Sequence, residues 1–152
     1  MKRREFLAAS AGCACLMLTK AGLAAPTAIA TATTGPVKVG DLASLTKEGI
    51  DIRFLSNGFF LVRGKDRVYA LSAFCTHQTD ARLSGRAGGE RLICPNHGSQ
   101  FALDGTVLRG PAKNNLGRLA ITVDALGQVT VDTSKTIPPD QAGETRAFVK
   151  TG

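Results

Sequence analysis

Two short motifs constrain this chain more than any other feature. One reads C-T-H from Cys75 to His77, the other reads C-P-N-H from Cys94 to His97, and sixteen residues separate them. They contain both histidines of the 152-residue protein, and the other two of its four cysteines lie within the first fifteen residues. Two thiolates and two imidazoles can hold either a tetrahedral zinc ion or an iron–sulfur centre. A fold that uses these residues for binding must bring the two motifs together.

The distribution of ligand types over the motifs distinguishes these two kinds of site. Common structural zinc sites place two Cys in one knuckle and the two remaining ligands in the other. Here each motif supplies one Cys and one His. That pattern favours a [2Fe–2S] centre in which two imidazoles replace two thiolates on one iron. A zinc-stabilised binding module without redox function is the alternative.

The residues around the second motif resemble the Rieske [2Fe–2S] family. The second loop of that family reads roughly C-P-x-H-G-S-x-[YF], followed by G-x-V-x-x-G-P-A. This chain has CPNHGSQF from Cys94 and GTVLRGPA from Gly105 to Ala112. The resemblance covers about a quarter of the chain, a cluster-binding subdomain at about residues 73–112. It implies an all-β fold, an antiparallel β-sandwich or barrel that carries this subdomain of two loops.

The resemblance also implies which residues hold the cofactor, one [2Fe–2S] cluster per chain. Cys75 and Cys94 would bind the inner iron, and His77 and His97 would bind the outer iron at the tip of the protein. Neutral imidazoles give the outer iron less negative charge than thiolates would, so an added electron is better tolerated and the reduction potential rises. By the same resemblance, the imidazoles would also be the exposed exit for the electron.

Three further residues are assigned to the cluster by the same resemblance. Ser99 supplies the hydroxyl expected near a bridging sulfide, where it would tune the potential. Gly110 and Pro111 would cover the cluster. Gly98, Gly110 and Pro111 are interpreted as backbone positions that let the loops approach the sulfides closely. The competing interpretation of these last three is that they are ordinary turn residues.

The chain departs from many high-potential relatives at three positions. Those relatives carry a second Cys pair that forms a disulfide between the loops, and here the two positions are Asp80 and Asn96. We therefore expect hydrogen bonds and packing to hold the loops. Phe101 stands where quinol-oxidising relatives place a Tyr whose hydroxyl reaches a cysteine sulfur. One of two tuning donors is thus retained and one is absent.

Residues 1–30 are predicted to be a twin-arginine signal peptide. Arg3 and Arg4 precede a hydrophobic segment, and the A-I-A run ending at Ala30 offers a cleavage site. The twin-arginine route exports folded, cofactor-loaded proteins, so a cluster could be assembled in the reducing cytoplasm before transfer to an oxidising periplasm. Two alternatives are a retained membrane anchor, which Lys20 and Pro26 interrupt, and lipidation at Cys13.

The remaining residues define a small, mildly basic domain. The leader holds four Lys and Arg and one Glu, so residues 31–152 keep 15 basic and 11 acidic side chains, a net charge of about +4. This size suits one domain, predicted at residues 31–137 with a tail at 138–152. No basic run with interleaved aromatic residues appears, which argues against nucleic-acid binding. A basic surface would favour an acidic redox partner.

Short strands separated by turn residues are predicted throughout residues 31–137. A strand is expected at 37–39, and hairpins are expected to pair 51–55 with 59–63, 59–63 with 67–73, and 119–123 with 129–131. Residues 68–71 are apolar at every position, which indicates a strand covered on both faces. Arg91–Ile93 leads into Cys94 in the same way. Residues 81–90 form a polar loop, and the tail from Pro138 is expected to run extended along the surface.

These features predict an electron-transfer protein: an exported soluble carrier or the small subunit of an exported oxidoreductase. Its partner would be a cytochrome, a cupredoxin or the large subunit of a molybdenum enzyme. The alternative is the Rieske subunit of a quinol-oxidising cytochrome bc-type complex, which the departures at Asp80, Asn96 and Phe101 disfavour. Membrane association is expected only through an uncleaved leader. Oxygenase catalysis would need a second iron site, and no His is left to build one.

Overall fold

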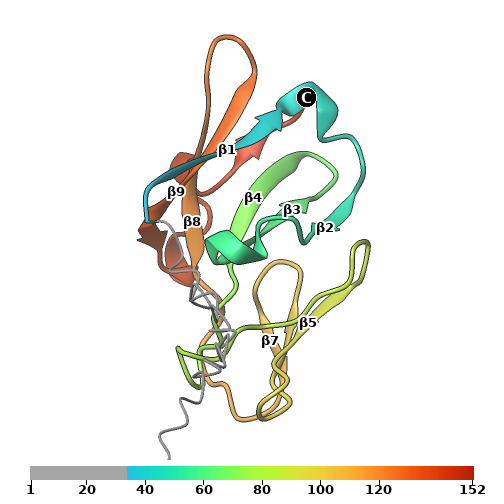
Figure 1. Ribbon diagram of the computed structural model, residues 1–152, viewed down its shortest axis with the longest axis vertical. Helices are drawn as coiled ribbons and strands as arrows, with labels where there is room; N and C mark the ends of the chain where they lie inside the picture. Colours follow the sequence, from blue (N-terminus) through green and yellow to red (C-terminus); the bar gives the residue numbers. More distant parts are fainter. Residues whose placement is uncertain (1–33) are drawn as a thin grey trace, which may run out of the picture.

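The computed structural model describes residues 34–152, and these form an all-β protein, as predicted (Figure 1). The predicted signal peptide at residues 1–30 lies outside the described residues. Within residues 34–152, no helix is long and apolar enough to cross a membrane. Figure 1 shows the two parts that matter for function: a larger sheet in the upper half of the view and a smaller lobe with β5 and β7 below it.

The described residues contain ten strands and four single-turn 3-10 helices. The strands are β1 Pro36–Asp41, β2 Gly49–Asp51, β3 Phe59–Arg63, β4 Arg67–Ser72, β5 Arg91–Ile93, β6 Gln100–Ala102, β7 Val107–Arg109, β8 Arg118–Val123, β9 Gln128–Ile137 and β10 Val149–Lys150. The 3-10 helices are η1 Leu42–Ser44, η2 Leu55–Asn57, η3 Pro139–Gln141 and η4 Thr145–Ala147.

The strands form two antiparallel sheets. The large sheet has the order β1-β9-β8-β4-β3-β2, with β10 also paired to β4. The small sheet has the order β5-β6-β7 and is inserted in the chain between β4 and β8. The connection that leaves β4 and the one that returns to β8 therefore enclose the whole lobe that contains the two motifs.

Strands β3 and β4 form a wall between two hydrophobic cores. Their side chains alternate: Phe59, Leu61, Val68 and Ala70 face one core, and Phe60, Val62, Tyr69 and Leu71 face the other. All eight of these residues are buried. The prediction that residues 68–71 are covered on both faces is confirmed, because a strand with cores on both sides needs apolar residues at successive positions.

The first core lies inside the large sheet, which curls around it. It joins side chains from strands far apart in the sheet order, among them Val39 of β1, Leu61 of β3, Ile121 of β8 and Val131 of β9. The second core lies between the large sheet and the small lobe. It contains Cys75 and Cys94 together with residues of β2, β3 and β4, so the predicted ligand cysteines are part of the packing that joins the two sheets.

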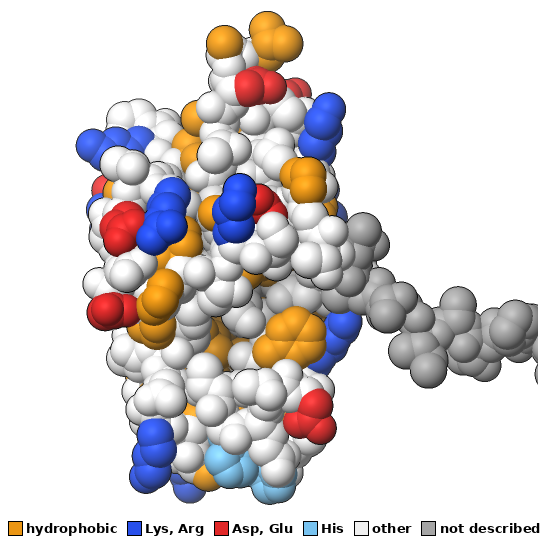
Figure 2. Space-filling model, turned by 90° about the vertical axis from the view of Figure 1, so that its left-hand side faces the viewer, with side chains coloured by type: hydrophobic (Ala, Val, Ile, Leu, Met, Phe, Trp, Pro, Cys, Tyr) orange, Lys and Arg blue, Asp and Glu red, His pale blue; other side chains and the backbone are white. Residues whose placement is uncertain are grey.

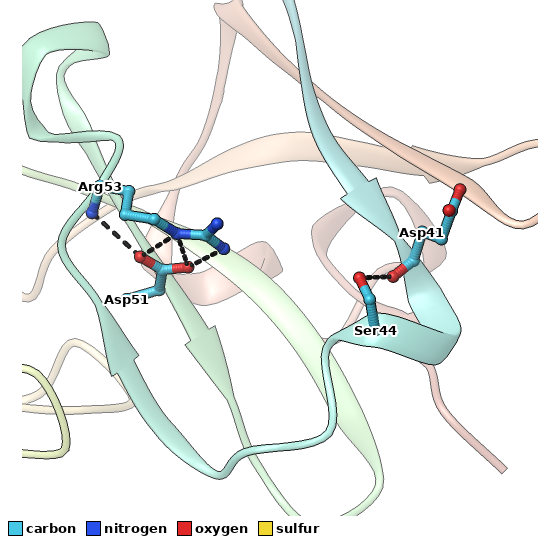
Figure 3. A network of polar contacts seen from close by, with 4 residues as sticks. All are labelled: Asp41, Ser44, Asp51 and Arg53. Atoms are coloured by element: carbon cyan, nitrogen blue, oxygen red, sulfur yellow. Dashed lines mark hydrogen bonds and ion pairs between the residues drawn. The ribbon is translucent and has the colours of Figure 1, made fainter.

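The first predicted hairpin is shorter than expected. Strand β2 ends at Asp51, and residues 55–57 form η2 instead of continuing the strand. The Asp51 carboxylate accepts hydrogen bonds from the backbone N–H and the guanidinium of Arg53, while Ser44 donates to the backbone oxygen of Asp41 at η1 (Figure 3). An Asp side chain that binds the N–H two residues later favours a turn over a strand, and this turn chemistry was not recognised in the sequence.

The segment after Pro138 also differs from the extended surface course expected for it. It forms η3 and η4 and then β10, which pairs with β4 through Val149 and Val68. Ala147 and Val149 are buried, and Arg118 donates a hydrogen bond to the backbone oxygen of Ala142. Residues 139–150 therefore complete the large sheet beside β8.

Candidate metal centre

Two strands deliver the predicted cysteines to the same place. Strand β4 ends at Ser72, three residues before Cys75, and β5 ends at Ile93, directly before Cys94. Bridges from Phe74 to Arg82 and from Ser84 to Ile93 tie the two segments together. The strand ends thus fix the backbone at both motifs, and short loops carry the remaining ligands.

Loop 1 comprises residues 73–83 and folds back on itself. The N–H of Cys75 donates to the oxygen of Ala81 (2.8 Å), and the N–H of Leu83 donates to the oxygen of Ala73 (2.8 Å). Ala81 and Leu83 are buried beneath the loop. Residues 75–80 therefore project as a closed tip with His77 on its outer side.

Loop 2 comprises residues 94–99 and is a tight turn. The N–H of Cys94 donates to the oxygen of Ser99 (2.8 Å), and the N–H of Gly98 donates back to the oxygen of Cys94 (3.0 Å). Gly98 has a φ of +71°, in the region that favours glycine. This turn exposes His97 while it keeps Cys94 buried.

Loop 3, residues 110–116, packs against loop 2. Gly110 has a φ of +101°, and a Cβ at this position would lie 2.6 Å from the Cα and 2.9 Å from the backbone N of Ser99. The N–H of Ala112 donates to the Ser99 hydroxyl oxygen (3.2 Å). Pro111, between Gly110 and Ala112, is half-buried. Gly110 is thus required for the close approach of two backbones, whereas a Cβ on Gly98 would meet nothing within 4 Å.

One contact between loops 1 and 3 had no recognisable sequence signal. The Thr76 hydroxyl donates to the backbone oxygen of Asn114 (2.5 Å). It joins the residue between Cys75 and His77 to a loop almost forty positions later. Because the acceptor is a backbone oxygen, the identity of Asn114 carries no trace of the contact.

The two thiols lie together in the interior. Cys75 and Cys94 are each 1% exposed, and their side chains are hydrogen-bonded to each other. Burial raises the pKa of the Cys75 thiol. The backbone N–H groups of His77 and Gln78 and the side chains of Cys94 and Ser99 lower it more, so the pKa lies below its usual value. These donors favour a thiolate, the form that binds metal.

The two imidazoles lie together at the surface. The ring centroids of His77 and His97 are 5.0 Å apart with an interplanar angle of 86°, and both residues are exposed. Figure 2 shows the pale blue histidines side by side at the lower end of the molecule, the end that the small lobe occupies in Figure 1. The structure therefore brings all four predicted ligands to one end of the small lobe.

The donor set fits a two-iron group with unlike ends. The four donors form two pairs, buried thiols and exposed imidazoles. Within residues 34–152, no group of three or more His, Cys, Asp or Glu residues is arranged to hold a single metal ion. Two thiolates on an inner iron and two imidazoles on an outer iron is the ligand division of a Rieske centre. Ser99, fully buried beside Cys75, supplies a hydroxyl to the inner pair.

Comparison with known protein families assigns the chain to one of them. The profile of the Rieske [2Fe-2S] domain family matches residues 35–130, more than half of the chain. The chain belongs to the Rieske [2Fe-2S] domain family and contains an electron-transfer domain of this type. Membership of this family implies a [2Fe–2S] cluster.

Curated relatives match over the cluster region. The chain is 45% identical over 56 residues to the cytochrome b6-f complex iron-sulfur subunit of Synechococcus sp. (strain JA-3-3Ab), covering 37% of this chain and 32% of the relative. It is 34% identical over 68 residues to the subunit of the same name from Synechococcus sp. (strain CC9605), covering 43% and 38%. The chain spans about a third of the length of the curated relatives it matches.

Solved structures match more of the chain at lower identity. The cyanobacterial plasma membrane Rieske protein of Synechocystis PCC 6803 is 24% identical with a TM-score of 0.45, covering 62% of this chain and 97% of its own. A chain from the complex of reduced oxygenase and oxidized ferredoxin in carbazole 1,9a-dioxygenase is 26% identical with a TM-score of 0.48, covering 68% and 97%.

Proposed function

We propose that this protein is a one-electron carrier whose [2Fe–2S] cluster is held by Cys75 and Cys94 on the inner iron and by His77 and His97 on the outer iron. The observation that carries the proposal is the pairing of two buried thiols with two exposed imidazoles at one end of the small lobe. When bound, the cluster supplies reversible uptake of one electron.

The residues of the chain divide the work of such a carrier. Burial of Cys75 and Cys94 between two sheets keeps water from the inner half of the site, while the hydrogen bonds around Cys75 stabilise the thiolate. Ser99 holds loop 3 through Ala112 and offers its hydroxyl to the thiol pair. His77 and His97, in contact with solvent, offer the short path to a partner.

Electron paramagnetic resonance of the dithionite-reduced protein, with iron and zinc analysis of the same sample, tests the proposal. We expect a Rieske-type signal and two irons per chain. A silent spectrum with one zinc per chain would overturn the redox function and support the zinc-stabilised module. Cys94→Ser should remove both the signal and the iron.

We further propose that the carrier is exported through the twin-arginine route and works in the periplasm as a soluble shuttle or as the small subunit of an oxidoreductase. The leader, with Arg3 and Arg4 before its hydrophobic segment, supports this. Fractionation of cells that produce the full chain tests it: replacement of both arginines by Lys should leave the cluster-loaded protein in the cytoplasm. Equal periplasmic amounts of the two forms would refute the route.

A second candidate is the Rieske subunit of a quinol-oxidising complex, favoured by the similarity to cytochrome b6-f iron-sulfur subunits. Asp80 and Asn96 at the positions of the second Cys pair, and Phe101 in place of Tyr, count against it. Purification from membranes of the source cells separates the candidates: co-isolation with a b-type cytochrome and quinol oxidation would establish the second.

A further inference from the structure

Charge pairing differs between the two lobes. All four ion pairs found within residues 34–152 lie in the large-sheet lobe: Arg53–Asp51, Arg67–Asp66, Lys135–Asp132 and Arg146–Glu144. The small lobe, residues 73–115, carries five cations and three carboxylates, and none of these forms an ion pair with another described residue. Its cations are Arg82, Arg86, Arg91, Arg109 and Lys113.

The small sheet also exposes apolar side chains. Ile93 is 39% exposed and Leu108 is 54% exposed, two of the four large hydrophobic residues exposed in the described part of the chain. Ile93 pairs with Gln100, which pairs with Arg109, so all three occupy one row across the sheet. Leu108 precedes Arg109 at the irregularity where the register of β6 and β7 shifts.

The backbone that carries these residues leads directly into the predicted electron exit. Ile93 directly precedes Cys94, and Arg109 directly precedes Gly110, which packs on Ser99 and Gly98 beside His97. Lys113 precedes Asn114, the residue bound by Thr76 next to His77. Figure 2 shows Lys and Arg side chains near the histidines at the lower end of the molecule.

We propose that Ile93, Leu108, Arg109 and Lys113 form a docking face for a redox protein that carries Asp and Glu around its own electron entry. This inference rests on the proposed function, because it places the partner against His77 and His97. An apolar centre with unpaired cations around it has the composition of a transient interface. Complementary charge would steer the acidic partner and set its orientation.

The orientation follows from the position of the opposite charge. Asp80 lies on loop 1, three residues beyond His77, and is exposed. Arg109 is the last residue of β7, and Lys113 lies on loop 3. A partner with carboxylates on one side of its entry site would therefore dock with that side over these two cations, because Asp80 would repel it.

The test uses the reduced, cluster-loaded protein and two trivalent one-electron oxidants of opposite charge, ferricyanide and tris(phenanthroline)cobalt(III). In each reaction one electron passes from the reduced cluster to the oxidant, whose metal goes from the trivalent to the divalent state. Stopped-flow absorbance is recorded at about 0.1 M ionic strength, where screening limits electrostatic effects to about 10 Å. The wild type is compared with Arg109→Gln/Lys113→Gln.

A matched pair at the opposite end of the molecule is the control. Lys65 lies in the β3–β4 turn and Lys150 pairs with Arg67 at the start of β4. Strand β4 runs from Arg67 for six residues toward Cys75. The start of β4 therefore lies about 20 Å from the cluster end of the strand. Lys65→Gln/Lys150→Gln removes the same net charge beyond the screening length.

We expect the docking-face variant to react about threefold more slowly with ferricyanide and no more slowly with the cobalt complex, and the control to change by less than about 1.5-fold. Equal effects of the two double variants, or slower reaction with both oxidants, would overturn the proposal. If the protein holds no reducible cluster, the proposed function itself fails, which this assay reveals before any rate is compared.

A binding measurement tests the same face without electron transfer. Fluorescently labelled poly-L-glutamate is titrated with each protein, and its anisotropy is followed at low salt. We expect the wild type and the control variant to bind with similar affinity and Arg109→Gln/Lys113→Gln to bind at least threefold more weakly. Equal affinity of all three proteins would show that acidic chains do not recognise this face.

Discussion

At the scale of single residues, two glycines that share a positive φ angle have different roles. Gly98 and Gly110 both have positive φ, but only Gly110 faces another backbone closely. We expect Gly98→Ala to cost about 1 kcal/mol of unfolding free energy, because it meets only backbone strain. Gly110→Ala should cost about 3 kcal/mol, because its Cβ would also meet Ser99 at 2.6 Å. Urea unfolding and iron content measure both; similar costs would contradict the close approach.

Ser99 gives the second prediction at this scale. Its hydroxyl lies against the thiol pair and accepts the N–H of Ala112. Ser99→Ala removes a donor that stabilises the more negative, reduced cluster, so we expect the midpoint potential to fall by about 20–60 mV, the equivalent of about 0.5–1.5 kcal/mol for one electron. Optically monitored redox titration measures it. Ser84→Ala, which removes an exposed hydroxyl bound to the oxygen of Ile93, should leave the potential unchanged.

At the scale of elements, β10 completes the large sheet where β8 leaves part of the β4 edge. Val149 is 7% exposed and belongs to the core inside the curled sheet. Val149→Ala removes two buried methyl groups and should lower the free energy of unfolding by about 2 kcal/mol. Leu126→Ala, at a residue 90% exposed in the β8–β9 turn, should change stability by less than about 0.5 kcal/mol. Equal urea midpoints for the two variants would contradict the packing of β10.

The β9 irregularity predicts a pH dependence. Asp132 stands where the β8–β9 register shifts, and its carboxylate accepts hydrogen bonds from the Ser134 hydroxyl, Lys135 and the Ser134 N–H, which lower its pKa to about 2. The carboxylate therefore contributes stability above the unfolded pKa near 4, which is lost as pH falls toward 2. As pH is lowered from 6 to 2, the urea midpoint should fall more steeply for the wild type than for Asp132→Asn. Parallel curves would contradict this.

The elements also show how far local sequence patterns reach. The hairpins at 59–63 with 67–73 and 119–123 with 129–131 were predicted, because apolar runs flank short turns. The end of β2 depended on the Asp51 side chain, and β10 depended on pairing with a strand just over eighty residues earlier. Pairing at such separation leaves no local periodicity, so a two-residue strand cannot be predicted this way.

The site shows the same boundary. The proximity of Cys75, His77, Cys94 and His97 was expected because rare residue types occur at fixed spacing, and the structure brings these four proposed ligands to one end of the small lobe. The different demands on Gly98 and Gly110, and the contact of Thr76 with loop 3, depend on which backbones meet. Residue spacing therefore predicts which side chains could act as ligands, but it does not predict the backbone contacts that hold the three loops together.

At the scale of the whole molecule, the sheets give the cluster site two unlike environments. Cys75 and Cys94 are part of the core that joins the large sheet to the small lobe. Removal of the cluster should therefore lower the stability of both sheets. His77 and His97 are exposed to solvent. We expect the iron-free protein to unfold at lower urea concentration than the loaded one, because a group bound only by the folded state stabilises it. Identical midpoints would show that the cluster does not stabilise the folded protein.

The reduction potential depends on the same whole-molecule environment. Phe101 is fully buried in the core with both cysteines and offers no hydroxyl. Asp80 carries an exposed carboxylate three residues beyond His77 on loop 1, which would favour the oxidised cluster, although the cations of the small lobe would offset part of its effect. The midpoint should therefore lie in the lower or middle part of the Rieske range of about −150 to +300 mV.

Two variants test these causes of the lowered potential separately. Phe101→Tyr adds a hydroxyl within the cysteine core and should raise the midpoint by about 20–60 mV at any salt concentration. Asp80→Asn removes an exposed charge and should raise it mainly at low salt, because screening weakens exposed charges. Redox titration at about 0.01 M and 0.5 M salt distinguishes the two. A wild-type value near +300 mV, or a salt-independent effect of Asp80→Asn, would contradict this account of the potential.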